Sequence, residues 1–171
     1  MKIGVILIFN NNEKDIDVKL FCKLLKSAKK TPLCFVNNGS IDNTLEVLKT
    51  VNEEAESDTI IVDVKKYKKN DVAVKAGARY LFNKCDLKQV GYLNMCSVNY
   101  DYFSEIFKTF TENKESVKDY NTLRSEKNQL HRRWEKNLFS IFDFLAFLNK
   151  NSLFYNTIPS LNNQSTNQKY S

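Results

Sequence analysis

Apolar residues in the first 97 positions occur either in short continuous runs or at helical spacing. The continuous runs predict buried strands over residues 3–9, 33–36, 59–64 and 89–95. Between them, apolar residues at helical spacing predict helices over residues 13–29, after Asp42, and over 70–83. Strands that alternate with helices of this length favour a parallel sheet with right-handed crossovers. We therefore predict an α/β fold with a parallel sheet whose strands lie in the order 3-2-1-4.

Beyond residue 97 the pattern predicts helices alone, over residues 100–111 and over 121–149 as one long helix or two. The second part of this region is densely apolar. On a helix its large residues would cover more than half of the circumference, which is wider than packing on one sheet face requires. These residues are Trp134, Leu138, Phe139, Ile141, Phe142, Phe144, Leu145, Phe147 and Leu148.

Three interpretations of the apolar segment 134–148 stay open. It is a core helix that packs over the sheet where later strands would add, or a helix shared by the two copies of a homodimer. The third interpretation is an interfacial membrane helix, with Arg132, Arg133 and Lys136 before the apolar run and Lys150 after it. The run is too short to span a bilayer, so such a contact would be peripheral.

The nonapeptide VNNGSIDNT, at residues 36–44, combines a strand end, a tight turn and a helix start. Gly39 permits the turn, because glycine adopts backbone conformations that other residues avoid. Ser40 or Asp42 is suited to accept hydrogen bonds from the first N–H groups of the following helix. The segment therefore predicts a strand, a turn and a capped helix in direct succession.

This nonapeptide resembles the V-D-D-G-S-x-D-x-T motif of family 2 glycosyltransferases of the GT-A type, with Asn37 and Asn38 in place of the two leading aspartates. Residues 73–77, AVKAG, resemble the A-V-R-A-G helix start of dolichol-phosphate-sugar synthases within the same family. Family members usually have a glycine before this block, and Asp71 replaces it in this chain. The resemblance covers the donor-nucleotide half of the family fold, up to about residue 97.

The end of the first strand adds to the resemblance. Family members have P-x-Y-N-x-E at this point, and Asn11 and Glu13 match the last part of that pattern. Asn10 replaces the tyrosine that usually lies beside the nucleobase, although Phe9 is one position away. The resemblance therefore implies that Phe9 supplies the aromatic contact to the base.

The resemblance implies a GT-A-like half-domain that binds a nucleotide-sugar. In that arrangement Asn38 would pair with the base edge and Lys75 would offset phosphate charge. The nucleotide-binding residues that it implies are Phe9, Asn10, Asn11, Glu13, Asn37, Asn38, Ser40 and Lys75. No catalytic residue is identified, because the resemblance ends before the acceptor half that supplies the family's catalytic base.

The family's metal-binding D-x-D follows the fourth strand, and here the corresponding residues are Asn94-Met95-Cys96. Magnesium and manganese favour charged oxygen ligands, so an amide and a thiol are poor substitutes for two carboxylates. We therefore expect no metal site and no cofactor. A magnesium or manganese ion would require that other acids rebuild the site, and Asp42, Asp63 and Asp71 are the candidates.

Two functions from different classes stay open. The first is a small family 2 glycosyltransferase that binds a nucleotide-sugar and transfers its sugar without a strongly held metal. The second is an inactive relative that keeps the half-domain as a binding or interaction module, in a dimer or with another partner. Titration with nucleotides and nucleotide-sugars, with and without manganese, discriminates between these functions.

The chain has 171 residues, of which 42% are hydrophobic and 27% charged. This is an ordinary globular composition, and it predicts a half-domain at residues 1–97, a helical extension packed on it at 98–158 and a disordered tail at 159–171. Cys22, Cys34, Cys85 and Cys96 show no C-x-x-C spacing, which favours buried free thiols in a reducing cytoplasm. The N-terminal apolar run is too short for a signal peptide.

The formal net charge is +6, and the densest basic cluster is Lys65, Lys66, Lys68 and Lys69 around Tyr67. A solvated loop explains this cluster. Its place after the third strand also suits a phosphate site, because open parallel sheets bind ligands at the carboxyl ends of their strands. No recognised motif supports nucleic-acid binding, and we expect none.

Overall fold

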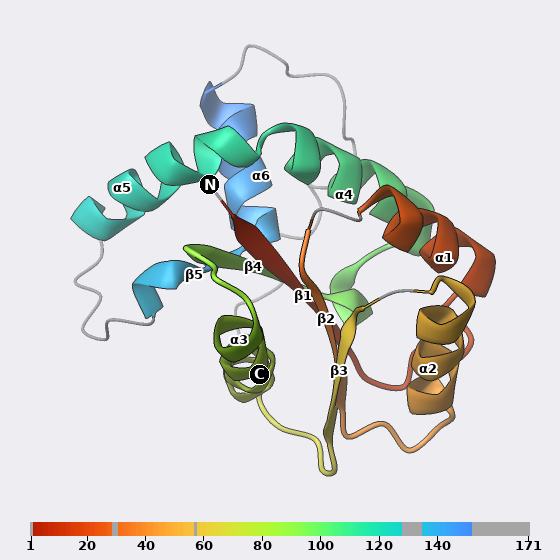
Figure 1. Cartoon of the computed structure of the whole chain (residues 1–171). Helices are drawn as coiled ribbons and strands as arrows, with labels where there is room; N and C mark the ends of the chain where they lie inside the picture. Colours follow the sequence, from red (N-terminus) through yellow and green to blue (C-terminus); the bar gives the residue numbers. More distant parts are fainter. Residues whose placement is uncertain (1, 29–30, 57, 128–134, 152–171) are drawn as a thin grey trace, which may run out of the picture.

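A computed structural model gives the arrangement of residues 2–28, 31–56, 58–127 and 135–151, which form one sheet with helices on both faces (Figure 1). The strands are β1 (Ile3–Phe9), β2 (Leu33–Asn38), β3 (Ile60–Val64), β4 (Gln89–Asn94) and β5 (Leu138–Ser140). The α-helices are α1 (Val18–Ser27), α2 (Thr44–Glu54), α3 (Asn70–Lys84), α4 (Phe103–Glu112), α5 (Val117–Lys127) and α6 (Ile141–Asn151). Short 3-10 helices are η1 (Met95–Ser97), η2 (Tyr100–Tyr102), η3 (Lys114–Ser116) and η4 (Glu135–Asn137).

All pairs of neighbouring strands are parallel, and the strand order is β3-β2-β1-β4-β5. The predicted α/β class is confirmed, and so is the order 3-2-1-4 of the first four strands. From β1 the chain winds outward to β2 and β3, and then it crosses back to β4 on the other side of β1. The winding direction therefore reverses between β1 and β4.

The prediction of helices alone after residue 97 is wrong at β5. Residues 138–140 pair with Val90, Gly91 and Tyr92 of β4, and so they satisfy backbone groups that would otherwise lie at a free edge. Gly91 leaves room for the ring of Phe139, whose nearest carbon would lie 3.1 Å from a Cβ at that position. A three-residue strand is too short to show its own period in a sequence.

Two hydrophobic cores lie on opposite faces of the sheet. Val5 and Leu7 of β1 belong to the larger core, to which α1, α2, α4, α5 and α6 contribute, whereas Ile6 and Ile8 face the smaller core beneath α3 (Figure 1). Helix α3 approaches the sheet closely at Gly77, where a Cβ would lie 2.8 Å from a methyl carbon of Val36. The helices after residue 97 therefore share one core with β1 and α1.

The described part of the apolar segment, residues 135–148, is divided among η4, β5 and α6 and does not form one helix. Phe139, Phe144 and Leu145 are buried in the larger core, which supports the core interpretation. The broad apolar surface that suggested a homodimer is thus largely covered within the chain, and dimerisation and peripheral membrane contact stay predictions. Trp134 with the two preceding arginines, and the predicted tail 159–171, lie outside the described residues.

In the described part of the chain, no helix combines the length and hydropathy that crossing a membrane requires. The four cysteines are free thiols. Cys22 and Cys34 are buried as predicted, and Cys85 is half-buried. Cys96 is exposed, so the prediction of a buried thiol is wrong there, because β4 ends one residue before η1 carries the chain to the surface.

Helix α1 begins at Val18, later than the predicted start at Glu13. Asp17 sets this start, since its Oδ1 accepts a hydrogen bond from the Leu20 N–H at 3.0 Å. The preceding residues form a loop in which Asn11 has a φ of 54°, a left-handed conformation that asparagine tolerates better than most residues. The polar groups of this loop are therefore placed at the carboxyl end of β1.

Candidate functional site

The carboxyl ends of β1, β2, β3 and β4 meet at one edge of the sheet, where each strand is followed by a polar loop. Open parallel sheets bind ligands outside this edge, near the point at which the winding direction reverses. In this chain the reversal lies between β1 and β4. Four of the eight predicted nucleotide-binding residues are in these loops, and two more, Asn37 and Asn38, end β2. The geometry of this edge therefore decides what it can bind.

The loop after β1 is joined to the loop after β2 by side-chain hydrogen bonds. Asn10 Nδ2 donates to the carbonyl oxygen of Asn38 at 2.8 Å. Asn11 Oδ1 accepts from the N–H of Ile41 at 2.9 Å, and the N–H of Asn11 donates to Ser40 Oγ at 3.0 Å. The structure thus brings Asn10, Asn11, Asn38 and Ser40 together, and each of them bonds to another member of the group.

Glu13 and Asp42 fix the start of α2. The Glu13 carboxylate accepts from the backbone N–H and the side-chain amide of Asn43, at 3.1 and 3.0 Å. Asp42 accepts from the N–H of Glu13 at 3.1 Å, and from the N–H and hydroxyl of Thr44 at 3.0 and 2.6 Å. Burial acts to raise the pKa of Asp42, but the hydrogen bonds from Thr44 and Glu13 outweigh it and lower that pKa. Asn43 occupies the N-cap position of α2, and of the two predicted capping side chains Asp42 accepts from the first N–H of the helix. Ser40 bonds to the loop after β1.

Asn37 and Asp63 are partners in the parallel register of β2 and β3. Asn37 is 3% exposed, and its Nδ2 donates to Asp63 Oδ1 at 2.8 Å. Lys65 forms an ion pair with the other oxygen of Asp63. The hydrogen bond from Lys65 and then the one from Asn37 lower the pKa of Asp63, against the effect of burial. The Oδ1 atom of Asn37 is buried and has no hydrogen-bond partner among the described residues.

Asn38 holds the lysine-rich loop after β3. Its Nδ2 donates to the Lys68 carbonyl oxygen at 2.8 Å, and its Oδ1 accepts from the Lys68 N–H at 3.0 Å. Gly39 has a φ of 67°, and a Cβ there would lie 2.0 Å from the backbone nitrogen of Tyr67. The backbone of the loop therefore lies directly against the glycine turn. The side chain of Tyr67 remains 66% exposed.

The residues at the end of β4 do not fit a divalent cation. Asn94 Oδ1 accepts from the Cys96 N–H at 3.1 Å and closes the turn of η1. The Cys96 thiol donates to the carbonyl oxygen of Asn10 at 3.3 Å and lies 3.4 Å from Asn12 Oδ1. An amide and a thiol that already have protein partners are weak ligands for magnesium or manganese.

The acids that were candidates to rebuild a metal site lie in separate groups. Asp42 bonds to Thr44 and Glu13, and Asp63 bonds to Asn37 and Lys65. Asp71 pairs with Lys75 at 3.1 Å on the surface of α3. Within the residues that the structure describes, no group of three or more His, Cys, Asp or Glu side chains is arranged to hold a metal ion.

Two of the predicted nucleotide-binding residues lie apart from the others. Phe9 has no exposed surface, and its ring packs against Phe21 and Phe35 with centroids 6.0 and 5.5 Å away. It is a core residue and does not present its ring to a ligand. Lys75 is on the outer surface of α3, where it pairs with Asp71 and lines a shallow cavity with Val72 and other α3 residues.

Sequence reasoning missed Asn12 as an organising residue. It is 4% exposed, and its N–H donates to Thr44 Oγ1 at 2.8 Å. Its Oδ1 accepts from the Asn10 N–H at 2.9 Å, and its Nδ2 donates to Asp15 Oδ2 at 3.1 Å. The run of three asparagines at 10–12 was the available signal, because short amides that bond to nearby backbone groups are typical of ordered turns.

No family model matches the chain, and no curated protein matches it either.

Proposed function

We propose that this protein binds a nucleotide or nucleotide-sugar at the carboxyl edge of β1, β2 and β3, without the help of a divalent cation. The proposal rests on the resemblance to the donor-nucleotide half of family 2 glycosyltransferases and on the form of the lysine-rich loop. The sheet supplies the binding edge that such ligands use in parallel α/β folds. The proposed activity is binding, and transfer of a sugar is not included.

One observation carries the proposal. Tyr67 is a largely exposed aromatic residue between four exposed lysines, in a loop that Asn38 fastens to the end of β2. The exposed ring of Tyr67 offers a flat surface on which a nucleobase can stack, and such stacking contributes roughly 1–3 kcal/mol. The neighbouring ammonium groups suit the phosphates of the same ligand. Tyr67 thus takes the role that the sequence assigned to Phe9.

The lysines supply the charge that a metal ion would otherwise supply. Lys66, Lys68 and Lys69 are exposed and form no ion pair among the described residues, whereas Lys65 pairs with Asp63. A diphosphate carries two or more negative charges at neutral pH, so several ammonium groups on one loop offset its charge by direct contact. Affinity at this edge should therefore fall as salt concentration rises, since exposed charges are screened.

The proposal does not extend to sugar transfer, because the residues after β4 are poor ligands for the metal ion that such transfer uses. In metal-dependent transfer a cation stabilises the leaving diphosphate. Here the amide of Asn94 and the thiol of Cys96 bond to the turn and to the loop after β1. The lysine loop can offset charge in the bound state, but no residue in the described chain is assigned as a catalytic base.

The experiment is a calorimetric titration with UDP, GDP and their common sugar conjugates, on the unmodified chain and on two tyrosine variants. Tyr67→Ala should raise the dissociation constant of the tightest-binding ligand at least tenfold, because it removes the stacking surface. Tyr80→Ala is the matched control, since Tyr80 is an exposed tyrosine on α3 at 48% exposure. Equal affinities for both variants, or no binding of any nucleotide at millimolar concentration, would overturn the proposal.

A further inference from the structure

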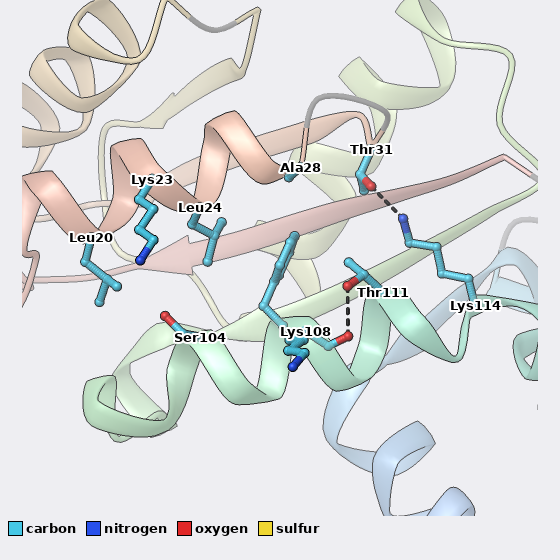
Figure 2. A pocket seen from close by; sticks show the side chains of 10 residues that line it. Leu20, Lys23, Leu24, Ala28, Thr31, Ser104, Lys108, Thr111 and Lys114 are labelled. Carbon is cyan, nitrogen blue, oxygen red and sulfur yellow. Dashed lines mark hydrogen bonds between the residues drawn. The ribbon is translucent and has the colours of Figure 1, made fainter.

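A cavity with a volume of about 570 Å³ lies between α1 and α4, away from the proposed nucleotide edge (Figure 2). Its apolar lining comes from Leu20, Leu24 and Ala28 of α1 and from Phe107 of α4. Leu24, Ala28 and Phe107 are themselves buried, at 5–6% exposure, so they form a firm floor. Volumes of this size accommodate small organic ligands.

Three lysines border this apolar cavity. Lys23 projects from α1, Lys108 from α4, and Lys114 lies at the end of the cavity in η3 (Figure 2). Lys108 lies 3.9 Å from Glu112, an exposed and long ion pair. Among the described residues, no carboxylate is within ion-pair distance of Lys23 or Lys114. The rim therefore carries positive charge that the described chain does not neutralise.

Lys114 is the most constrained of the three lysines. It is half-buried, and its ammonium donates to the hydroxyl of Thr31, which is 7% exposed, at 2.6 Å. Burial lowers the pKa of Lys114. Among the described residues this half-buried ammonium meets a hydroxyl and no carboxylate. Partial desolvation of a charge without a counter-ion is unfavourable. This end of the cavity is therefore suited to an anion.

The two ends of the cavity differ in character. Figure 2 shows Thr31 and Lys114 at one end and Leu20 and Ser104 at the other, with α1 and α4 running alongside between them. A ligand that matches both ends has a compact negative head and an apolar chain. The head would meet Lys114 and the Thr31 hydroxyl, and the chain would lie on Leu24 and Phe107.

We propose that the α1/α4 cavity binds a free single-chain carboxylate of the fatty-acid type, with its carboxylate at Lys114 and Thr31. The complementary features are the unneutralised ammonium groups and the apolar floor, neither of which the nucleotide site uses. The carboxylate accepts hydrogen bonds from the Lys114 ammonium and the Thr31 hydroxyl. The hydrocarbon chain is stabilised by burial of apolar surface. This site is independent of the proposed nucleotide site.

The first arm of the test compares probes on the unmodified chain by calorimetry. Decanoate should bind, hexanoate should bind more weakly, and each methylene withdrawn from the cavity should weaken binding by up to about fourfold. Decyltrimethylammonium has the same chain length with the opposite charge, and it should not bind. Equal binding of decanoate and decyltrimethylammonium would overturn the proposal, because the rim charge would then play no part.

The second arm uses variants. Lys114→Met keeps most of the apolar stem and should lower the affinity for decanoate at least tenfold. The control Lys19→Met removes an exposed charge from α1 outside the cavity, and it should leave this affinity within twofold of that of the unmodified protein. Ser104→Trp, at an exposed position, should fill the apolar end and weaken decanoate more than hexanoate. If Lys114→Met does not fold, Ser104→Trp decides alone, and equal loss for both chain lengths would reject the site.

A third arm separates a free carboxylate from a lipid surface. The protein should remain in the supernatant when vesicles of neutral or anionic phospholipid are sedimented, because the cavity takes one hydrocarbon chain at a time. Binding to anionic vesicles that depends on Lys114, together with no binding of soluble decanoate, would overturn the proposal in favour of a membrane contact. Retention of decanoate binding in the Tyr67→Ala variant keeps this result separate from any failure of the nucleotide proposal.

Discussion

The side-chain amide of Asn37 donates to Asp63 across β2 and β3 at 2.8 Å, and the two residues occupy paired positions in the parallel register. This pair explains why an amide suits position 37, where the glycosyltransferase motif has an acid. Asn37 is only 3% exposed, so an aspartate in its place would bring a second, buried carboxylate against that of Asp63. Two carboxylates so close cannot both ionise without a large cost.

Asn37→Asp should therefore be destabilising in a pH-dependent way. The pKa of one carboxyl in the new pair would rise, so the cost is small below the ordinary aspartate pKa and grows as pH rises towards and through the raised value. A rise of roughly two pKa units corresponds to about 3 kcal/mol of stability lost at neutral pH. Urea denaturation at pH 4.5 and pH 7.5 measures this difference.

The control is the double variant Asn37→Asp/Asp63→Asn, which restores one amide and one carboxylate in exchanged positions. It should recover most of the stability at pH 7.5. The unmodified chain behaves oppositely at low pH: the pKa of Asp63 is lowered, so its stabilising effect is present above the unfolded-state pKa and is lost as pH falls through the folded-state value. An Asn37→Asp variant as stable as the parent at pH 7.5 would contradict the Asn37–Asp63 contact.

Gly39→Ala tests whether the lysine loop rests against the turn. Residue 39 has a φ of 67°, and the added methyl carbon would lie 2.0 Å from the Tyr67 nitrogen. The left-handed conformation alone costs about 1–2 kcal/mol for alanine, and the clash adds to it. Thermal and urea unfolding should show that the free energy of unfolding falls by at least about 2 kcal/mol.

Ser40→Ala is the neighbouring control for Gly39→Ala. It removes one exposed hydroxyl that accepts from Asn11, so it should cost about 1 kcal/mol or less. The glycine variant should also lose more nucleotide affinity than the serine variant, because the displaced loop carries Tyr67. Similar stabilities for the two variants would mean that the 65–69 loop does not lie on Gly39.

Cys96 should be the thiol that reacts first with a small disulfide reagent in the native protein. It is exposed at the end of β4, whereas Cys22 and Cys34 are buried. Burial raises the pKa of Cys34 to about 12, and burial followed by the charge of Glu54 raises that of Cys22, so neither forms much thiolate at pH 8. Timed labelling with mass spectrometry measures the rates site by site.

A bound nucleotide should slow the labelling of Cys96, since the thiol lies 3.3 Å from the Asn10 carbonyl oxygen in the loop after β1. Cys96→Ser should abolish the fast phase and leave stability almost unchanged. Fast labelling of Cys34 at the same pH would contradict the burial of β2. Protection of Cys85 in place of Cys96 would move the ligand away from the carboxyl edge.

The aromatic C-terminal helix α6 provides a stability test. Phe144 has no exposed surface and packs against Phe110, Phe139 and Tyr120 with ring centroids 5.6–6.0 Å apart. Phe144→Ala should cost about 3–5 kcal/mol, as expected for a large side chain removed from a packed core. Phe147→Ala should cost less, because Phe147 is only partly buried.

This contrast also settles how dimerisation must be tested. A charge at Phe144 would unfold the chain, so loss of a dimer in such a variant would carry no information about an interface. Sedimentation of the unmodified chain at micromolar concentration is the appropriate measurement, and a 19.9 kDa species would reject the predicted homodimer. If Phe147→Ala proves more damaging than Phe144→Ala, the placement of α6 in the core is wrong.

The first four strands were predictable because each contains a short apolar run. These runs are completely buried in β1 and β2, and partly buried in β3 and β4. The start of α1 was less accessible, since Glu13 and Asp17 are both reasonable helix-start residues and only the loop geometry selects Asp17. Strand β5 escaped notice because three residues carry no period, and its pairing depends on Gly91, far away in the sequence.

The candidate site was predictable as a set of loops but not as a set of contacts. The order of strands and turns places Asn10, Asn38 and the lysine loop at one edge, which pattern and resemblance suggested. The partner of each amide depends on register and rotamer, so the bonds of Asn37 to Asp63 and of Asn38 to Lys68 required the structure. The alternation of side chains along β1 directs Phe9 into the core.

The most direct test of metal-independent nucleotide binding is calorimetric titration of the unmodified chain with UDP and GDP, once in manganese and once in EDTA. We predict equal affinities in the two conditions, because the charge of the diphosphate is met by the lysines around Tyr67 and the groups of Asn94 and Cys96 already have partners. A tenfold gain in manganese, equivalent to about 1.4 kcal/mol, would contradict the account and show that acids of this chain assemble a metal site with the ligand.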